Sequence, residues 1–164
     1  MASRRTRSRD AATQALGLLV RREHSRLELK RKLDSRGHAP DEVEATLDRL
    51  QASGLQSDVR FAEVLVRSRI AQGHGPLRIA AELRQHGLDG AQVERALAAA
   101  EPDWPVLARD LCRRRFRGPA TGHAERLRRA RFLAGRGFPP AVIRDCLDLD
   151  PGGEDLPDGS EDEP

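Results

Sequence analysis

Apolar residues recur along this chain with a period of fifty residues, in three copies without insertions. In each copy a Leu is followed four residues later by Gly, then by an aliphatic residue and a second Leu. The matched sets are Leu33, Gly37, Val43 and Leu47; Leu83, Gly87, Val93 and Leu97; and Leu133, Gly137, Ile143 and Leu147. Apolar positions four apart share one face of a helix, and a Gly after such a run ends it. The period therefore predicts a tandem array of helix, Gly stop, turn and helix.

Local start and stop signals add a third helix to each unit. Asp10 precedes the first apolar run, Ser25 and Glu28 form an S-x-x-E capping box, and Pro40 and Pro76 suit helix starts. No segment alternates with the period of two expected of a strand. We predict an all-α, elongated tandem array of three three-helix repeats, similar to helix-turn-helix units, at residues 10–55, 56–101 and 102–150.

Charge divides the chain into a basic body and an acidic end. Residues 1–150 hold all 29 Lys and Arg and 20 of the 26 Asp and Glu, whereas residues 151–164 hold six acids among Pro and Gly. We expect residues 151–164 to be a disordered acidic tail and residues 1–9, with four arginines, to be a disordered basic arm. Both ends could serve solubility alone. Alternatively, the arm contacts phosphate or acidic protein while the tail competes for the basic surface.

Composition and motifs disfavour several functional classes. No apolar run approaches the ~20 residues of a membrane span, so we expect a cytoplasmic protein without membrane contact. Cys112 and Cys146 lie in helical patterns and are interpreted as reduced packing residues. The histidines resemble loop residues, no metal-ligand motif occurs, and Gly73-His74-Gly75-Pro76 lacks the Lys of a phosphate loop. We predict a monomeric, non-enzymatic protein with no cofactor and no metal site.

Arginine dominates the remaining candidate surface, supplying 27 of the 29 bases. Between residues 109 and 136, ten arginines meet only two acids. Arg113, Arg114 and Arg115 are binding candidates, although three consecutive helical residues spread over about 200 degrees and cannot all face one partner. Four of the five aromatic residues lie in the same third unit. They either fill its core or stack on the bases of single-stranded nucleic acid.

Two arginines interrupt the apolar repeat. Arg69 replaces a Leu of the first unit, and Arg129 takes the position of Leu29 and Ile79. One interpretation is that both lie at the edge of the apolar stripe, or that Arg69 caps its helix or pairs with an acid such as Glu82. The alternative is that both project into a groove between units and bind a partner.

The second unit carries a distinctive set of short segments: Phe61-Ala62-Glu63, Val66-Arg67-Ser68-Arg69, Gly73-His74-Gly75-Pro76, Arg78-Ile79 and Glu82-Leu83-Arg84. Together they resemble the signature of the RecX family, regulators of the RecA recombinase. Arg22-Glu23-His24-Ser25 is similar to the family's first repeat, and Asp103-Trp104 to its third. The third unit departs from the pattern, since Gly122 and His123 stand where a Gly-Pro helix start is expected, and the acidic tail is no part of it.

The resemblance implies a cytoplasmic protein that binds in the groove of the RecA filament on DNA. It further implies suppression of ATP hydrolysis, strand exchange and coprotease activity, and so modulation of recombination, DNA repair and the SOS response. The candidate contacts with filament or DNA are Arg67, Arg69, Arg78, Arg84, Arg113, Arg114, Arg115 and Arg129. An alternative function is sequence-tolerant binding of naked DNA, with a steep dependence on salt.

Overall fold

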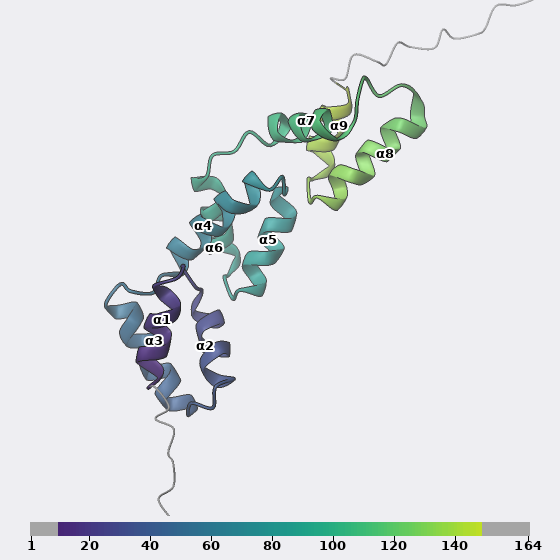
Figure 1. Ribbon diagram of the computed structural model, residues 1–164. Coiled ribbons are helices and arrows are strands. Elements are labelled where there is room, and N and C mark those ends of the chain that lie inside the picture. The colour runs from purple at the N-terminus through teal and green to yellow at the C-terminus, as the bar shows by residue number, and fades with distance from the viewer. Residues whose placement is uncertain (1–9, 149–164) are drawn as a thin grey trace, which may run out of the picture. The chain divides into compact units, whose positions relative to one another are not determined.

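The computed structural model of the chain describes residues 10–148 (Figure 1), and within that range it contains nine α-helices and no strand. The helices are α1 (Ala11–Leu19), α2 (Arg26–Asp34), α3 (Pro40–Ala52), α4 (Asp58–Ala71), α5 (Pro76–Gln85), α6 (Gly90–Ala99), α7 (Trp104–Arg115), α8 (Gly122–Gly135) and α9 (Pro140–Asp148). The predicted all-α fold with three-helix repeats in tandem is confirmed. The basic arm and the acidic tail lie outside the described residues.

The described residues form two compact units. One comprises residues 10–71 and 79–101, and the other comprises residues 72–78 and 102–148. The segment Gln72–Arg78, with the first turn of α5, therefore packs with the third repeat. The predicted elongation and the repeat boundaries stay predictions.

Local signals place the helices of the first repeat. The Asp10 carboxylate accepts a hydrogen bond from the Thr13 amide at 2.7 Å, and the Ser25 hydroxyl accepts one from the Glu28 amide at 3.1 Å. Each side chain thereby satisfies an amide that the first helical turn leaves without a partner. The second half of the predicted capping box is wrong, because the Glu28 carboxylate accepts hydrogen bonds from Arg22. A nearby guanidinium outcompetes the Ser25 amide for this carboxylate.

The same turn follows the second helix of every repeat. Gly37, Gly87 and Gly137 have φ angles of 84°, 89° and 87°. The amide after each Gly donates to the carbonyl of the Leu four positions before that Gly, at 3.4, 3.2 and 3.1 Å. This pattern is a Schellman helix end, whose left-handed residue is most often Gly because Gly has no Cβ. The fifty-residue period therefore encodes one backbone geometry three times.

Two of these turns also pack closely against the preceding repeat. A Cβ on Gly87 would lie 3.1 Å from the Cβ of Leu27, at the start of α2. A Cβ on Gly137 would lie 2.4 Å from the Cβ of Arg78, in the first turn of α5. At the equivalent Gly37, no atom of residues 10–148 other than its chain neighbours lies within 4 Å of such a position. Hence the glycine turns of the second and third repeats each pack on the second helix of the preceding repeat. The first repeat has no preceding repeat, and its turn lacks this contact.

Aromatic and aliphatic side chains fill the third repeat. Phe138 packs edge-on against Trp104, with ring centroids 6.3 Å apart, and Phe116 against Phe132 at 5.3 Å. Phe138 and Phe116 are 2% and 7% exposed, which supports the core interpretation over base stacking for both rings. Leu133 completes this core together with the buried thiols of Cys112 and Cys146, which form no disulfide.

Candidate binding surface

The Gly73-His74-Gly75-Pro76 segment is a packing motif. The Gly75 amide donates to the Arg136 carbonyl at 2.8 Å, and the Leu77 amide donates to the Gly137 carbonyl at 3.0 Å. A Cβ on Gly75 would lie 2.4 Å from the carbonyl carbon of Gly137. Because these amides already have backbone partners, they are not available to a phosphate group. The motif joins the start of α5 to the turn after α8.

Arg69 pairs with Glu82, as one of the two interpretations of the sequence expected. Its Nε donates to Glu82 Oε2 at 2.7 Å and its Nη2 donates to Oε1 at 2.6 Å. The hydrogen bond to Glu82 raises the pKa of Arg69 further, so the guanidinium stays charged. This bidentate pair connects α4 and α5 within the second repeat, and its geometry is the one that Lys could not reproduce.

Arg129 lies inside the third repeat, with only 4% of its surface exposed. Its Nη2 donates to the Gly118 carbonyl at 2.7 Å and its Nε donates to Glu125 at 3.1 Å. Its guanidinium also lies over the Phe116 ring, 5.3 Å from the centroid. A buried guanidinium needs such partners to offset its lost hydration. Arg129 therefore ties the segment between α7 and α8 to the core.

The three consecutive arginines at the end of α7 are exposed and face different neighbours. Arg113 pairs with Asp110, Arg114 donates to the Asp110 carbonyl at 3.3 Å, and Arg115 lies 5.5 Å from the centroid of the Phe116 ring. Cations in the last helical turn are favoured by the helix dipole. Of the three, Arg113 alone lines the pocket of the third repeat.

The remaining candidates are divided between the two compact units. Arg67 and Arg84 are exposed in the first unit, where Arg69 also lies. Arg78 is exposed in the second unit and donates to the Gly135 carbonyl at 3.3 Å, next to the contact between Gly75 and Gly137. Arg113, Arg114, Arg115 and Arg129 belong to that second unit as well.

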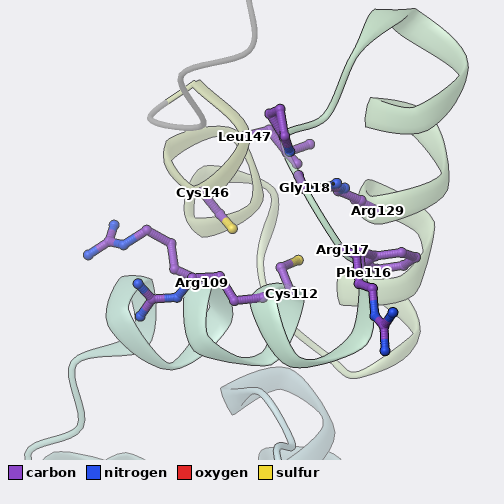
Figure 2. A pocket seen from close by; sticks show the side chains of 10 residues that line it. Arg109, Cys112, Phe116, Arg117, Gly118, Arg129, Cys146 and Leu147 are labelled. Atoms are coloured by element: carbon purple, nitrogen blue, oxygen red, sulfur yellow. Dashed lines mark hydrogen bonds between the residues drawn. The ribbon is translucent and has the colours of Figure 1, made fainter.

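A pocket of about 650 Å³ lies between α7, α9 and the segment that follows α7 (Figure 2). Four arginines line it: Arg109, Arg113, Arg117 and Arg129. Its other walls are mostly apolar, and in Figure 2 the sulfur atoms of Cys112 and Cys146 point into the space between α7 and α9. Among the lining residues that belong to the described range 10–148, none is acidic. The sequence signal for this site was the arginine-rich stretch, but the stretch alone does not show which arginines converge.

In the first repeat, several cations form ion pairs with carboxylates. Arg26 bonds to Glu44 and Asp48, both at 2.8 Å, and Arg60 at the start of the second repeat bonds to Glu23 at 2.8 Å. Burial alone would raise the pKa of Glu28, but the Arg22 hydrogen bond and nearby cations outweigh it and hold that pKa below its usual value. Four of the eight cations of residues 10–55 therefore pair with acids of the same repeat: Arg22, Arg26, Lys30 and Lys32.

Net charge follows the same division. Residues 10–55 hold eight bases and eight acids, and residues 56–101 hold six of each. Residues 102–148 hold eleven bases and five acids, a net charge of +6. The positive potential of the described chain thus comes from the third repeat, where an anionic partner would be attracted most strongly.

The histidines are mostly turn residues, as expected, but not all are exposed. His24 is 3% exposed, and its Nδ1 donates to the Arg22 carbonyl at 2.9 Å. Burial lowers the pKa of His24 because it disfavours the charged ring. The His86 ring packs on Phe61 with centroids 4.8 Å apart.

Sequence reasoning also missed the Asp89–Gln92 capping box at the start of α6, although the spacing of the two residues is visible in the sequence.

Two further properties of residues 10–148 bear on function. Within that range, no group of three or more His, Cys, Asp or Glu side chains is arranged to hold a metal ion. None of its helices is both long enough and apolar enough to cross a membrane.

Fold and surface together define an all-helical tandem-repeat protein with a basic third repeat. Family models for the first, second and third three-helix domains of RecX match residues 11–50, 57–97 and 106–147. The chain belongs to the RecX family.

Similar proteins agree with this assignment. The chain is 51% identical over 149 residues to the regulatory protein RecX of Xanthomonas axonopodis pv. citri (strain 306), covering 90% of this chain and 91% of the relative. It is 47% identical over 150 residues to that of Stenotrophomonas maltophilia (strain K279a), covering 90% and 91%. The crystal structure of RecX from Lactobacillus salivarius is similar with a TM-score of 0.70 and 25% identity, covering 85% of this chain and 95% of that one.

Proposed function

We propose that this chain regulates the RecA recombinase by binding the RecA nucleoprotein filament, and that it inhibits ATP hydrolysis, strand exchange and coprotease activity. The supporting observation is the ordered match of all three RecX domains, on a chain whose relatives are named regulatory proteins. The chain acts by occupancy and catalyses no reaction itself. It works in the cytoplasm as a monomer, without a cofactor.

The excess of arginine on the third repeat supports this proposal. Acidic protein loops and DNA phosphates both attract such a surface, and Arg binds carboxylate and phosphate bidentately. In the proposed surface, the exposed side chains of Arg67, Arg84 and Arg113 to Arg115 contact the partner. Arg69, Arg78 and Arg129 support it by holding α5 and the segment after α7 in place.

The test is ATP turnover by RecA on single-stranded DNA with increasing amounts of this chain. Replacing Arg113, Arg114 and Arg115 by Gln together removes three exposed charges from the third repeat and leaves its buried side chains unchanged. We expect the half-inhibitory concentration to rise at least about tenfold, which corresponds to about 1.4 kcal/mol of lost binding. A double variant, Arg67→Gln with Arg84→Gln, tests the second repeat in the same way.

The matched control is Arg21→Gln with Arg31→Gln, which removes two exposed charges from the balanced first repeat. Its inhibition should equal that of the unaltered chain. Unchanged inhibition by both the triple and the double variant would refute the assigned surface. Absence of inhibition by the unaltered chain at any ratio to RecA would refute the function itself.

A second candidate function, sequence-tolerant DNA binding, is favoured by the uncompensated charge of the third repeat. It predicts tight binding to naked DNA without RecA, with an affinity that falls steeply as salt increases. The same titration separates the two functions. Inhibition that follows the affinity for naked DNA across variants indicates competition for DNA, whereas inhibition far below one molecule per RecA subunit indicates action on the filament.

A further inference from the structure

The pocket of the third repeat combines an apolar interior with a cationic lining. Cys112, Phe116, Cys146 and Leu147 supply the apolar walls. Among the four lining arginines, Arg113 pairs with Asp110 and Arg129 with Glu125. Arg109 and Arg117 form no ion pair with any acid of residues 10–148. Such a site suits a ligand that carries both negative charge and a small apolar group.

The chain itself contains a segment with this chemistry. This segment is residues 149–164, which lie outside the described residues. They hold seven acids and no base, against the net charge of +6 on residues 102–148. Leu156 stands within the acidic run Glu154-Asp155-Leu156-Pro157-Asp158. An aliphatic side chain flanked by carboxylates matches apolar walls flanked by guanidinium groups.

The chain between the pocket and this segment is long enough for the two to make contact. Leu147 lines the pocket, and Leu156 follows it by nine residues, a length that spans up to about 30 Å when extended. Pro151, Gly152 and Gly153 stand between the two, and Pro-Gly is a turn signal that lets the chain reverse. A tether this short gives an effective concentration on the order of millimolar. A contact whose dissociation constant is well below that concentration would then be largely formed.

We propose that residues 154–158 bind in the arginine-lined pocket of the third repeat, with Leu156 against the apolar walls and the flanking carboxylates on Arg109, Arg113 and Arg117. The tail thereby occupies an arginine-lined site on the most basic of the three repeats until a polyanion displaces it. This inference goes beyond the proposed function, because it concerns the chain alone and is tested without RecA.

The test compares two full-length variants with equal changes in charge. One carries Glu154→Gln, Asp155→Asn and Asp158→Asn, and its control carries Glu161→Gln, Asp162→Asn and Glu163→Gln. In nuclear magnetic resonance spectra at low salt, the backbone amides of Cys112, Phe116 and Leu147 should shift in the first variant and much less in the control. Leu156→Ser should shift the same amides without a change in charge. Equal shifts in the two charge variants, or no shift in any, would overturn the proposal.

A second measurement uses a single-stranded oligonucleotide as a polyanion probe. The variant neutralised at residues 154, 155 and 158 should bind the probe about three- to tenfold more tightly than the unaltered chain at ~0.05 M salt, because a competing charged segment is released. The gain should vanish when Arg109→Gln and Arg117→Gln are also present. A gain that persists in that background places the tail elsewhere and overturns the pocket assignment. Failure of RecA inhibition would affect the proposed function alone.

Discussion

The first and third repeats share three helices and one glycine turn, yet they use their cations in opposite ways. In the first repeat, Arg26 is held by two carboxylates, and the eight bases of residues 10–55 are matched by eight acids. In the third, Arg129 is held by a carbonyl, one carboxylate and an aromatic face, and six positive charges of residues 102–148 have no acidic counterpart. The backbone fold that the two repeats share therefore depends on core and turn residues. Charged surface residues can differ between repeats without changing that fold, and so they are available for binding.

The turn itself provides the largest contrast, because Gly137 is packed and Gly37 is open. Gly137→Ala should destabilise the chain by about 3 kcal/mol or more, since left-handed backbone strain adds to a clash with Arg78. Gly37→Ala carries the same strain without the clash and should cost about 1 kcal/mol. Urea unfolding of both variants, followed by helical circular dichroism, measures the difference.

Gly75→Ala tests the same contact with the Gly137 turn, through the residue that packs against it. Its φ lies outside the left-handed region, so the substitution is opposed only by the approach of its Cβ to backbone atoms: the Gly137 carbonyl carbon and oxygen at 2.4 Å and the Phe138 nitrogen at 2.5 Å. The loss should approach that of Gly137→Ala. If Gly137→Ala and Gly37→Ala cost the same and Gly75→Ala costs nothing, then the close packing does not contribute to stability.

The buried arginine gives the next contrast, since the first repeat has Leu29 where the third has Arg129. Arg129→Leu restores an apolar side chain but removes the hydrogen bond to the Gly118 carbonyl. We expect hydrogen exchange at the amides of Gly118, Ala120 and Thr121 to accelerate about tenfold, equivalent to about 1.4 kcal/mol of local stability.

Arg131→Leu on the exposed face of α8 is the control and should leave exchange at those amides unchanged. Exchange rates that are equal in the two variants would mean that the segment after α7 is held by other contacts. A large loss of global stability in Arg129→Leu alone would place the arginine in the folding core itself.

The repeated elements were predictable because one residue type dictates one local geometry. A Gly after an apolar run gives the left-handed turn, and Asp or Ser before a run caps the helix, whatever the rest of the chain does. Partner choice among charged groups was less predictable. Glu28 has Arg22 and its own helix start within reach, and only the folded arrangement decides between them. The pocket was likewise hidden, because it needs α7 and α9 side by side.

A pH contrast follows from the buried His24 of the first repeat, whose position in the third repeat is the exposed Ala124. Burial lowers the pKa of His24 from 6.5, so below that pH the unfolded chain takes up a proton that the folded chain resists. The free energy of unfolding contributed by this group is therefore complete above pH 6.5 and decreases as pH falls toward the folded pKa.

His24→Asn keeps a donor for the Arg22 carbonyl and removes the titration. It should flatten the dependence of stability on pH between about 7 and 5, by at most about 1.4 kcal/mol per pH unit. Urea unfolding at several pH values measures the slope, with His123→Asn at an exposed site as the control. An unchanged slope in His24→Asn would assign the pH dependence to other groups.

The smallest contrast concerns two arginines with different surroundings. Arg26 bonds to Glu44, Asp48 and Gln51, whereas Arg114, within residues 10–148, bonds only to the Asp110 carbonyl four residues before it. Networks of surface ion pairs contribute little, so Arg26→Ala should cost about 1 kcal/mol or less, and the cost should shrink in 0.5 M salt. Arg114→Ala should leave the unfolding midpoint unchanged, or raise it slightly by relieving repulsion among the uncompensated arginines. A larger loss for Arg114→Ala than for Arg26→Ala would mean that the third repeat needs its arginines for folding, and its excess charge could no longer be assigned to binding.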